Sequence, residues 1–168
     1  LRKRTYGGLT LRHEHCSGAP PLCNGWSAVK PMLQSFRVLL VEDDDSLRVC
    51  LGEFLADNGW DVVATGLGNE AIRVAREQRF DFSILDFHLL DGRTGLEVFQ
   101  TIRTFRPLPA ILMSGAASRE EAVLAQQAGV FTFLRKPLEL ERLRQSVHHL
   151  IQHHFGGPLV RPRNLPPR

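Results

Sequence analysis

The chain has 168 residues, of which 43% are hydrophobic and 23% charged, and these values fit one compact domain with short flanking segments. No stretch approaches the roughly 18 consecutive apolar residues that a membrane helix needs, and residues 1–30 lack the apolar block of a secretory signal. Three scattered cysteines make no disulfide framework. We therefore expect a cytoplasmic protein without a membrane partner.

The formal net charge of +3 is distributed unevenly along the chain. Residues 1–35 carry a net +4, residues 36–155 a net −4 and residues 156–168 a net +3. The two basic ends have no apolar periodicity, which favours solvated tails over a nucleic-acid-binding surface. We expect a disordered basic leader at 1–35, a folded domain at 36–155 and a basic, proline-rich tail at 156–168. Because Met32 stands four residues before the first apolar run, residues 1–31 are expected to be dispensable.

Short apolar runs alternate with helical stripes from residue 36 to residue 155. The first run, residues 36–41, precedes Leu47, Leu51 and Leu55 at helical spacing, and Asn58-Gly59 supplies a left-handed helix end. The same pairing of strand and helix recurs along the chain. In chain order it predicts a strand at 61–65, a helix at 70–78, a strand at 82–85, a helix around 96–102, a strand at 110–113, a helix at 119–128, a strand at 130–134 and a helix from 140 to 151.

Some side chains on these helices have ordinary interpretations. Cys50 stands beside the apolar stripe of the first helix and is expected to be a buried small hydrophobe. Leu140 continues the apolar stripe of the last helix. His149 and His153 lie one turn apart on that helix, a spacing that suits metal binding, but a solvated and pH-sensitive helix end is favoured.

Five β/α units in about 120 residues predict an α/β fold with a parallel sheet covered by helices on both faces, because parallel neighbours need crossover helices. The carboxyl ends of such strands meet at one edge, where ligand sites form. Each reactive residue at this edge could be structural by itself, but together they predict a functional site. They are Glu42-Asp43-Asp44-Asp45 after the first strand, Asp86 after the third, Ser114 after the fourth and Lys136-Pro137 after the fifth.

The clustered carboxylates indicate a cation at this edge. They cannot all stay ionised in a small cleft without one, and oxygen ligands without histidine or thiolate suit Mg²⁺ or Ca²⁺ rather than zinc, with Mg²⁺ favoured. Mg²⁺ takes one or two carboxylates and a phosphate, which leaves a carboxylate free to attack a phosphoryl group and form an aspartyl phosphate. Lys136 would then neutralise the phosphoryl oxygens, and the Ser114 hydroxyl could hydrogen-bond one of them. The residues therefore predict a phosphate acceptor.

Residues 36–155 resemble the receiver domain of bacterial two-component response regulators. This resemblance implies a flavodoxin-like, doubly wound (βα)5 sandwich with strand order 2-1-3-4-5. The features that carry it are the run Val-Leu-Leu-Val-Glu42-Asp43-Asp44, the pair Leu85-Asp86, the triplet Met113-Ser114-Gly115, Phe133 three residues before the lysine, and the pair Lys136-Pro137.

The resemblance also implies a single-domain response regulator in a phosphorelay. Asp86 would accept a phosphoryl group from a histidine kinase or a histidine phosphotransfer protein. Asp43 and Asp86 would ligate Mg²⁺ together with the backbone carbonyl of His88, and Glu42 would hold a metal-bound water. Such a domain catalyses its own phosphotransfer and a slow autodephosphorylation, and is otherwise no enzyme.

The same resemblance implies how the signal is passed on. Ser114 would swing toward the phosphoryl group and Phe133 would turn inward behind it. The surface formed by the fourth helix, the fifth strand and the fifth helix would then change its affinity for a downstream protein. The bond between Lys136 and Pro137 is expected to be cis.

One loop departs from the pattern of the family. The family usually has proline four residues after the acceptor and glycine eight after it, whereas this chain has Leu90, with Gly92 and Gly95 six and nine residues on. The loop at 87–94 is therefore one residue longer than the common form. This difference affects the expected position of the His88 carbonyl but leaves the acceptor strand unchanged.

Two other functions are compatible with parts of the pattern. A phosphatase of the haloacid-dehalogenase type also uses an Asp-x-Asp after its first strand, a later Ser and a Lys, but it would leave Asp86 without a role. A receiver-like interaction module that is never phosphorylated would not need the complete set of acids, Ser114 and Lys136. Labelling of Asp86 by acetyl phosphate distinguishes a receiver from both.

Overall fold

The computed structural model describes residues 35–116 and 118–156. Most of the expected leader (residues 1–34) and most of the expected tail (residues 157–168) lie outside these ranges. The prediction that residues 1–31 are dispensable therefore also concerns residues outside the described part of the chain. The elements in chain order are β1 (Arg37–Val41), α1 (Asp45–Asp57), β2 (Asp61–Thr65), α2 (Gly68–Glu77), β3 (Phe82–Asp86), α3 (Gly95–Arg103), β4 (Ala110–Ser114), α4 (Arg119–Gln127), β5 (Thr132–Arg135) and α5 (Leu140–Phe155).

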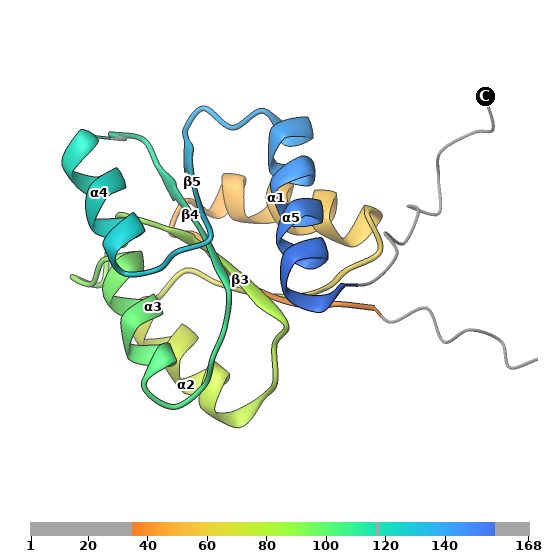
Figure 1. Ribbon diagram of the computed structural model, residues 1–168, viewed down its shortest axis with the longest axis horizontal. Coiled ribbons are helices and arrows are strands. Elements are labelled where there is room, and N and C mark those ends of the chain that lie inside the picture. The colour runs from red at the N-terminus through yellow and green to blue at the C-terminus, as the bar shows by residue number, and fades with distance from the viewer. Residues whose placement is uncertain (1–34, 117, 157–168) are drawn as a thin grey trace, which may run out of the picture. The chain divides into compact units, whose positions relative to one another are not determined.

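The described strands form one parallel sheet in the order β2-β1-β3-β4-β5, as expected (Figure 1). Side chains alternate across the sheet, so β1 sends Leu39 and Val41 into one apolar cluster and Val38 and Leu40 into another. The first cluster also holds buried residues of α2, α3 and α4, and the second those of α1 and α5. The predicted doubly wound α/β fold is thus confirmed.

Local signals in the sequence fix several helix ends. Asp44 accepts a hydrogen bond from the backbone N–H of Leu47 and caps α1. Gly59 ends the same helix with a φ of 90°, a left-handed conformation that costs glycine little. Thr94 and Glu97 form a reciprocal capping box at the start of α3. The caps of Asp44 and Thr94 lie at the carboxyl edge of the sheet, where the expected site is, whereas Gly59 lies at the opposite edge, just before β2.

Most element boundaries agree with the sequence prediction to within one residue, but α5 ends four residues later than predicted, at Phe155, and two elements begin two residues away from the predicted position. Helix α2 begins at Gly68 rather than residue 70, because Asp91 of a distant loop accepts a hydrogen bond from the Asn69 N–H at 3.0 Å and satisfies this helix end. Strand β5 begins at Thr132 rather than residue 130. The residue before this strand, Phe131, already donates a hydrogen bond from its N–H to the Ala110 carbonyl of β4, and the paired residues begin at Thr132 and Ile111.

Two side chains expected in the core are exposed. Cys50 is exposed because α1 turns Leu51 and Leu55 inward, and a rotation of about 100° per residue leaves their neighbour at the side of the helix. Leu140, the first residue of α5, is 39% exposed, whereas Leu143, Val147, Leu150 and Ile151 are buried. The helical stripe therefore identified the core face of α5 but not its first turn.

Two further expectations concern the backbone and the membrane. The peptide bond between Lys136 and Pro137 is cis, as the resemblance implied. In the described part of the chain, no helix combines the length and the apolar character needed to cross a bilayer.

Gly95 begins α3 where this helix passes the end of β3. A Cβ atom at this position would lie 2.0 Å from the backbone oxygen of Asp86 and 2.9 Å from its carbonyl carbon. The Gly95 N–H also donates to the Phe87 carbonyl at 2.9 Å, so the two segments cannot separate without losing this bond. The longer loop therefore still places a glycine against the backbone of the expected acceptor.

We expect Gly95→Ala to lower the free energy of unfolding by about 3 kcal/mol, because the new methyl group overlaps backbone atoms that cannot rotate away. Chemical denaturation measures this change. The matched control is Gly52→Ala in α1, where an added Cβ meets nothing within 4 Å and should raise stability by about 0.5–1 kcal/mol. Equal stabilities of Gly95→Ala and the wild type would contradict the close approach.

Candidate functional site

The acidic run after β1 divides into two pairs with different roles. Asp44 caps α1, and Asp45 forms an ion pair with Arg48 in the first turn of that helix. Glu42 and Asp43 remain at the carboxyl edge of the sheet, where Glu42 is completely buried and Asp43 is half-buried. The Asp-x-Asp pattern expected of a haloacid-dehalogenase site therefore uses a residue, Asp45, that faces solvent.

Lys136 joins the first, third and fifth strands through its ammonium group. Its Nζ atom donates to the two carboxylate oxygens of Glu42 at 2.9 and 2.7 Å and to Oδ2 of Asp86 at 2.7 Å. Asp86 itself is 5% exposed at the end of β3. The structure thus brings together three of the residues that the sequence pattern placed at one sheet edge.

Burial and charge act in opposite directions on these groups. Burial raises the pKa of Glu42 above its ordinary value, with the neighbouring Asp86 carboxylate adding to the rise and the hydrogen bond from Lys136 opposing it. For Lys136, burial by itself would lower the pKa, but the hydrogen bonds to Asp86 and Glu42 raise it above its ordinary value. The ammonium is therefore held in its charged form while Glu42 resists ionisation.

The acidic side chains also meet the requirements of a hard cation. One carboxylate oxygen from each of Glu42, Asp43 and Asp86 lies within 4.8 Å of the others. Oδ1 of Asp86 is buried and accepts no hydrogen bond from the described residues, although such atoms normally have a partner. Three carboxylates, one of which has a buried oxygen without a hydrogen-bond partner among the described residues, form a set of oxygen ligands that fits a divalent cation such as Mg²⁺.

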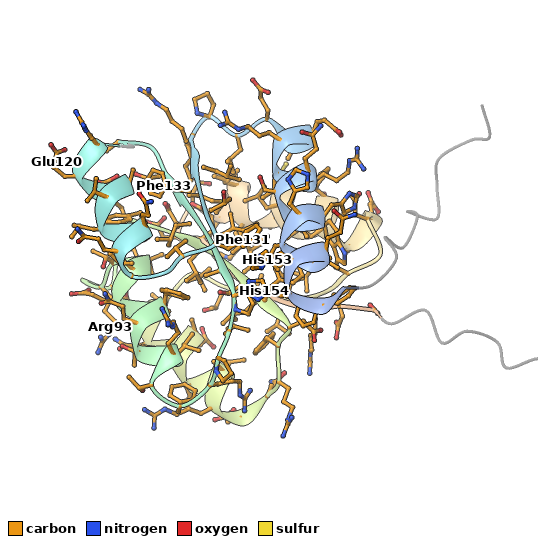
Figure 2. The ribbon with its side chains drawn as sticks, in the orientation of Figure 1. Arg93, Glu120, Phe131, Phe133, His153 and His154 are labelled. Carbon is orange, nitrogen blue, oxygen red and sulfur yellow. The ribbon has the colours of Figure 1, made fainter. Side chains whose placement is uncertain are left out.

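Ser114 and Phe133 lie beside this group on the neighbouring strands. Ser114 ends β4, is completely buried, and donates a hydrogen bond from its hydroxyl to Glu121 of α4 at 2.7 Å. The ring of Phe133 on β5 is half-buried and meets the ring of Phe87 edge-on, with centroids 6.4 Å apart. Figure 2 shows Phe133 close to α4. A cleft of about 310 Å³, lined by Ala122, Ala125, Gln126, Val130, Phe131, Thr132 and Phe133, separates α4 from β5.

His88 and the last histidines have separate positions. The His88 side chain is exposed, and its Nε2 atom lies 3.3 Å from Glu121. His153 and His154 at the end of α5 pack against Phe131, with ring centroids 5.6 and 5.7 Å apart (Figure 2). His153 is exposed, which agrees with a solvated helix end.

Two contributors to the site had no distinctive signal in the sequence. Arg48 donates from its guanidinium to the backbone carbonyl of Glu42 at 2.8 Å and more distantly to that of Asp43 at 3.4 Å. Glu121 contacts both Ser114 and His88, but in the sequence it is one of several acids at the start of a helix. Acidic residues are common in the first turn of a helix because the positive end of the helix dipole stabilises their charge. The sequence pattern therefore gave no reason to select Glu121.

Comparison with known families gives a match over most of the described residues. The family model described as "Response regulator receiver domain" matches residues 38–148. Among curated proteins, the transcriptional regulatory protein GlrR of Escherichia coli is 34% identical over 116 residues, which are 68% of this chain and 26% of that protein. The cell cycle response regulator CtrA of Brucella ovis is 30% identical over 121 residues, covering 71% of this chain and 52% of that protein. The chain thus spans about a quarter to a half of these relatives.

Solved structures share the same architecture. The receiver domain of a LuxO repressor protein from Vibrio parahaemolyticus superposes with a TM-score of 0.67 at 31% identity, covering 71% of this chain and 92% of that one. A CheY-like receiver domain protein from Methanospirillum hungatei has a TM-score of 0.68 at 23% identity, covering 71% of this chain and 95% of that one, a likeness that shows the fold alone.

Proposed function

We propose that this chain, which belongs to the response regulator receiver domain family, accepts a phosphoryl group on Asp86 from a histidine kinase or a histidine phosphotransfer protein. Receiver domains are signalling domains of phosphorelays rather than classical enzymes. The observation that carries the proposal is the buried Oδ1 atom of Asp86, which has no hydrogen-bond partner among the described residues, while Oδ2 is held by Lys136.

The transfer requires a nucleophile and a fixed positive charge. A carboxylate oxygen of Asp86 would attack the phosphorus of a phosphohistidine, forming an O–P bond as the P–N bond breaks and leaving the electron pair on the imidazole nitrogen. Lys136 would remain beside the phosphoryl oxygens and compensate their charge. A Mg²⁺ ion held by Asp43, Asp86, the His88 carbonyl and, through a water, Glu42 would neutralise further charge on the phosphoryl group.

The proposed output uses the groups on the two neighbouring strands. The Ser114 hydroxyl would turn to a phosphoryl oxygen, and Phe133 would move inward toward the space that Ser114 leaves. The surface of α4, β5 and α5 would then bind a downstream protein with altered affinity. The exposed Val123 and Leu124 of α4 and the cleft beside Phe133 support this surface as the contact site.

The remaining parts of the proposal concern the organisation and location of this chain. We take residues 36–155 as the receiver, 1–35 as a basic leader and 156–168 as a basic tail, and we propose a cytoplasmic location. Its own phosphotransfer and a slow autodephosphorylation would be the reactions that it catalyses. Nucleic acid and membrane are not among the proposed partners.

Labelling with acetyl phosphate tests the function and the acceptor together. We expect Mg²⁺-dependent incorporation of phosphate that is lost in EDTA, and reduction with borohydride should convert the labelled aspartate to homoserine. Trypsin should place this residue between Arg79 and Arg93, and fragmentation should assign it to Asp86. A label in the peptide of residues 38–48 would support the phosphatase alternative, and no label would support an interaction module that is never phosphorylated.

A further inference from the structure

Glu121 connects α4 to the end of β4 and to the loop that follows the proposed acceptor. Its Oε2 atom accepts the hydrogen of the Ser114 hydroxyl at 2.7 Å, and its Oε1 atom lies 3.3 Å from Nε2 of His88. The Glu121 side chain is only 13% exposed, so the contact with Ser114 is shielded from water. Both oxygens of this carboxylate therefore face residues next to the site.

Apolar packing contributes little to the position of α4. Of its residues, Ala125 is the one whose side chain is buried, and Val123 and Leu124 are 43% and 50% exposed. Ser118 caps the helix by accepting the N–H of Glu121, which fixes the first turn locally. The bond between Glu121 and Ser114 is therefore a substantial part of what attaches this turn to the end of β4.

A hydroxyl group has one hydrogen to donate. While Ser114 donates it to Glu121, the same hydrogen cannot be given to a phosphoryl oxygen on Asp86. A carboxylate is a strong acceptor, and hydrogen bonds to charged groups contribute more than those between neutral groups. Glu121 and a phosphoryl group thus compete for one donor.

We propose that Glu121 is a positioning residue that holds Ser114 in the unphosphorylated arrangement and sets the cost of switching. The inference rests on the proposed role of Ser114. Phosphorylation at Asp86 offers the hydroxyl a second anionic acceptor, and the transfer of the hydrogen bond to it releases Glu121. The first turn of α4 then loses this hydrogen bond to the end of β4, so the chemistry at Asp86 changes the surface that is proposed to bind the downstream protein.

Beryllofluoride with Mg²⁺, a stand-in for the phosphoryl group, provides the test. Removing the carboxylate in Glu121→Ala should tighten beryllofluoride binding about ten-fold, because the competing bond is absent. Glu121→Gln keeps an acceptor oxygen without the charge and should fall between this variant and the wild type. Glu120→Ala removes the same charge from the same turn, and its side chain lies at the outer end of α4 in Figure 2, so its affinity should stay at the wild-type value.

A double-mutant cycle separates the competition from a general effect of charge. In a Ser114→Ala background, Glu121→Ala should change the affinity for beryllofluoride by less than about three-fold. The reason is that this background lacks the hydroxyl group for which Glu121 and beryllofluoride compete. Equal effects of Glu121→Ala in the two backgrounds would overturn the inference. Failure of the wild type itself to bind beryllofluoride would instead overturn the proposed function.

A measurement without any phosphoryl group tests the attachment directly. Glu121→Ala and Ser114→Ala should each speed exchange of the Ala122 amide, which donates to the Ser118 carbonyl at the start of α4, about ten-fold, and the double variant should exchange no faster than either single one. Unchanged exchange in both single variants would contradict the attachment even if beryllofluoride binds normally.

Discussion

Asp86→Asn should abolish labelling by acetyl phosphate, with a loss on the order of a thousand-fold or more, because the amide that replaces the carboxylate is not a nucleophile. The shape of the side chain is kept, and Lys136 can still donate to the remaining carbonyl oxygen. The expected result is a folded protein that does not incorporate phosphate. Scintillation counting after a timed incubation, together with a melting curve, measures both properties.

The control for this variant is Asp57→Asn, which removes an exposed carboxylate at the end of α1. It should be labelled at the rate of the wild type. Asp86→Asn also removes the negative charge that repels the Glu42 carboxylate. The variant should therefore not melt at a lower temperature than the wild type. Labelling of Asp86→Asn at the native rate would show that another residue accepts the phosphoryl group.

Lys136→Met should make the stability of the protein strongly dependent on pH. Burial and Asp86 raise the pKa of Glu42, and Lys136 opposes this rise, so its removal moves the pKa of the folded state further above the ordinary 4.5. Between the two pKa values the unfolded state binds fewer protons than the folded one, so the free energy of unfolding falls as pH rises through that interval. At pH 7 we expect a loss of about 3 kcal/mol relative to the wild type, as for a broken buried ion pair.

Urea denaturation at a series of pH values measures this effect. The loss should shrink as the pH falls toward 4.5 and disappear below it, where Glu42 becomes protonated in the unfolded state as well as in the folded one. Adding Glu42→Gln to Lys136→Met removes the buried charge and should restore most of the stability at pH 7. A deficit that is the same at all pH values would mean that Lys136 acts through packing rather than through the charge of Glu42.

The sequence predicted the fold and most of the site because both follow from local patterns. Alternating apolar runs and helical stripes predict the strands, and the rule that parallel strands end at one edge predicts that Glu42, Asp86 and Lys136 lie together. The hydrogen bonds of Lys136 to Glu42 and Asp86 agree with that placement. Their chemical roles stay predictions, to be tested by labelling.

What the sequence did not predict depends on contacts between distant segments. The exposure of Cys50 depends on which side of α1 the sheet covers, and apolar character alone does not define that side. The start of α2 depends on Asp91, which lies 22 residues away from its partner Asn69. Glu121 acquires its role from the position of α4 over the end of β4. In each case the deciding interaction is tertiary.

The ion pair between Glu42 and Lys136 has a consequence for how the protein is made. The two residues are 94 positions apart in the chain, and Lys136 is 50 positions from Asp86. Closing such long loops costs entropy that the chain recovers only when the intervening strands have paired, which is a late event in folding. During synthesis the acidic residues therefore emerge well before the ammonium that neutralises them. If Asp86 is the acceptor as proposed, labelling by a phosphodonor should become possible only when β5 has joined the sheet, so a growing or half-folded chain would not be labelled.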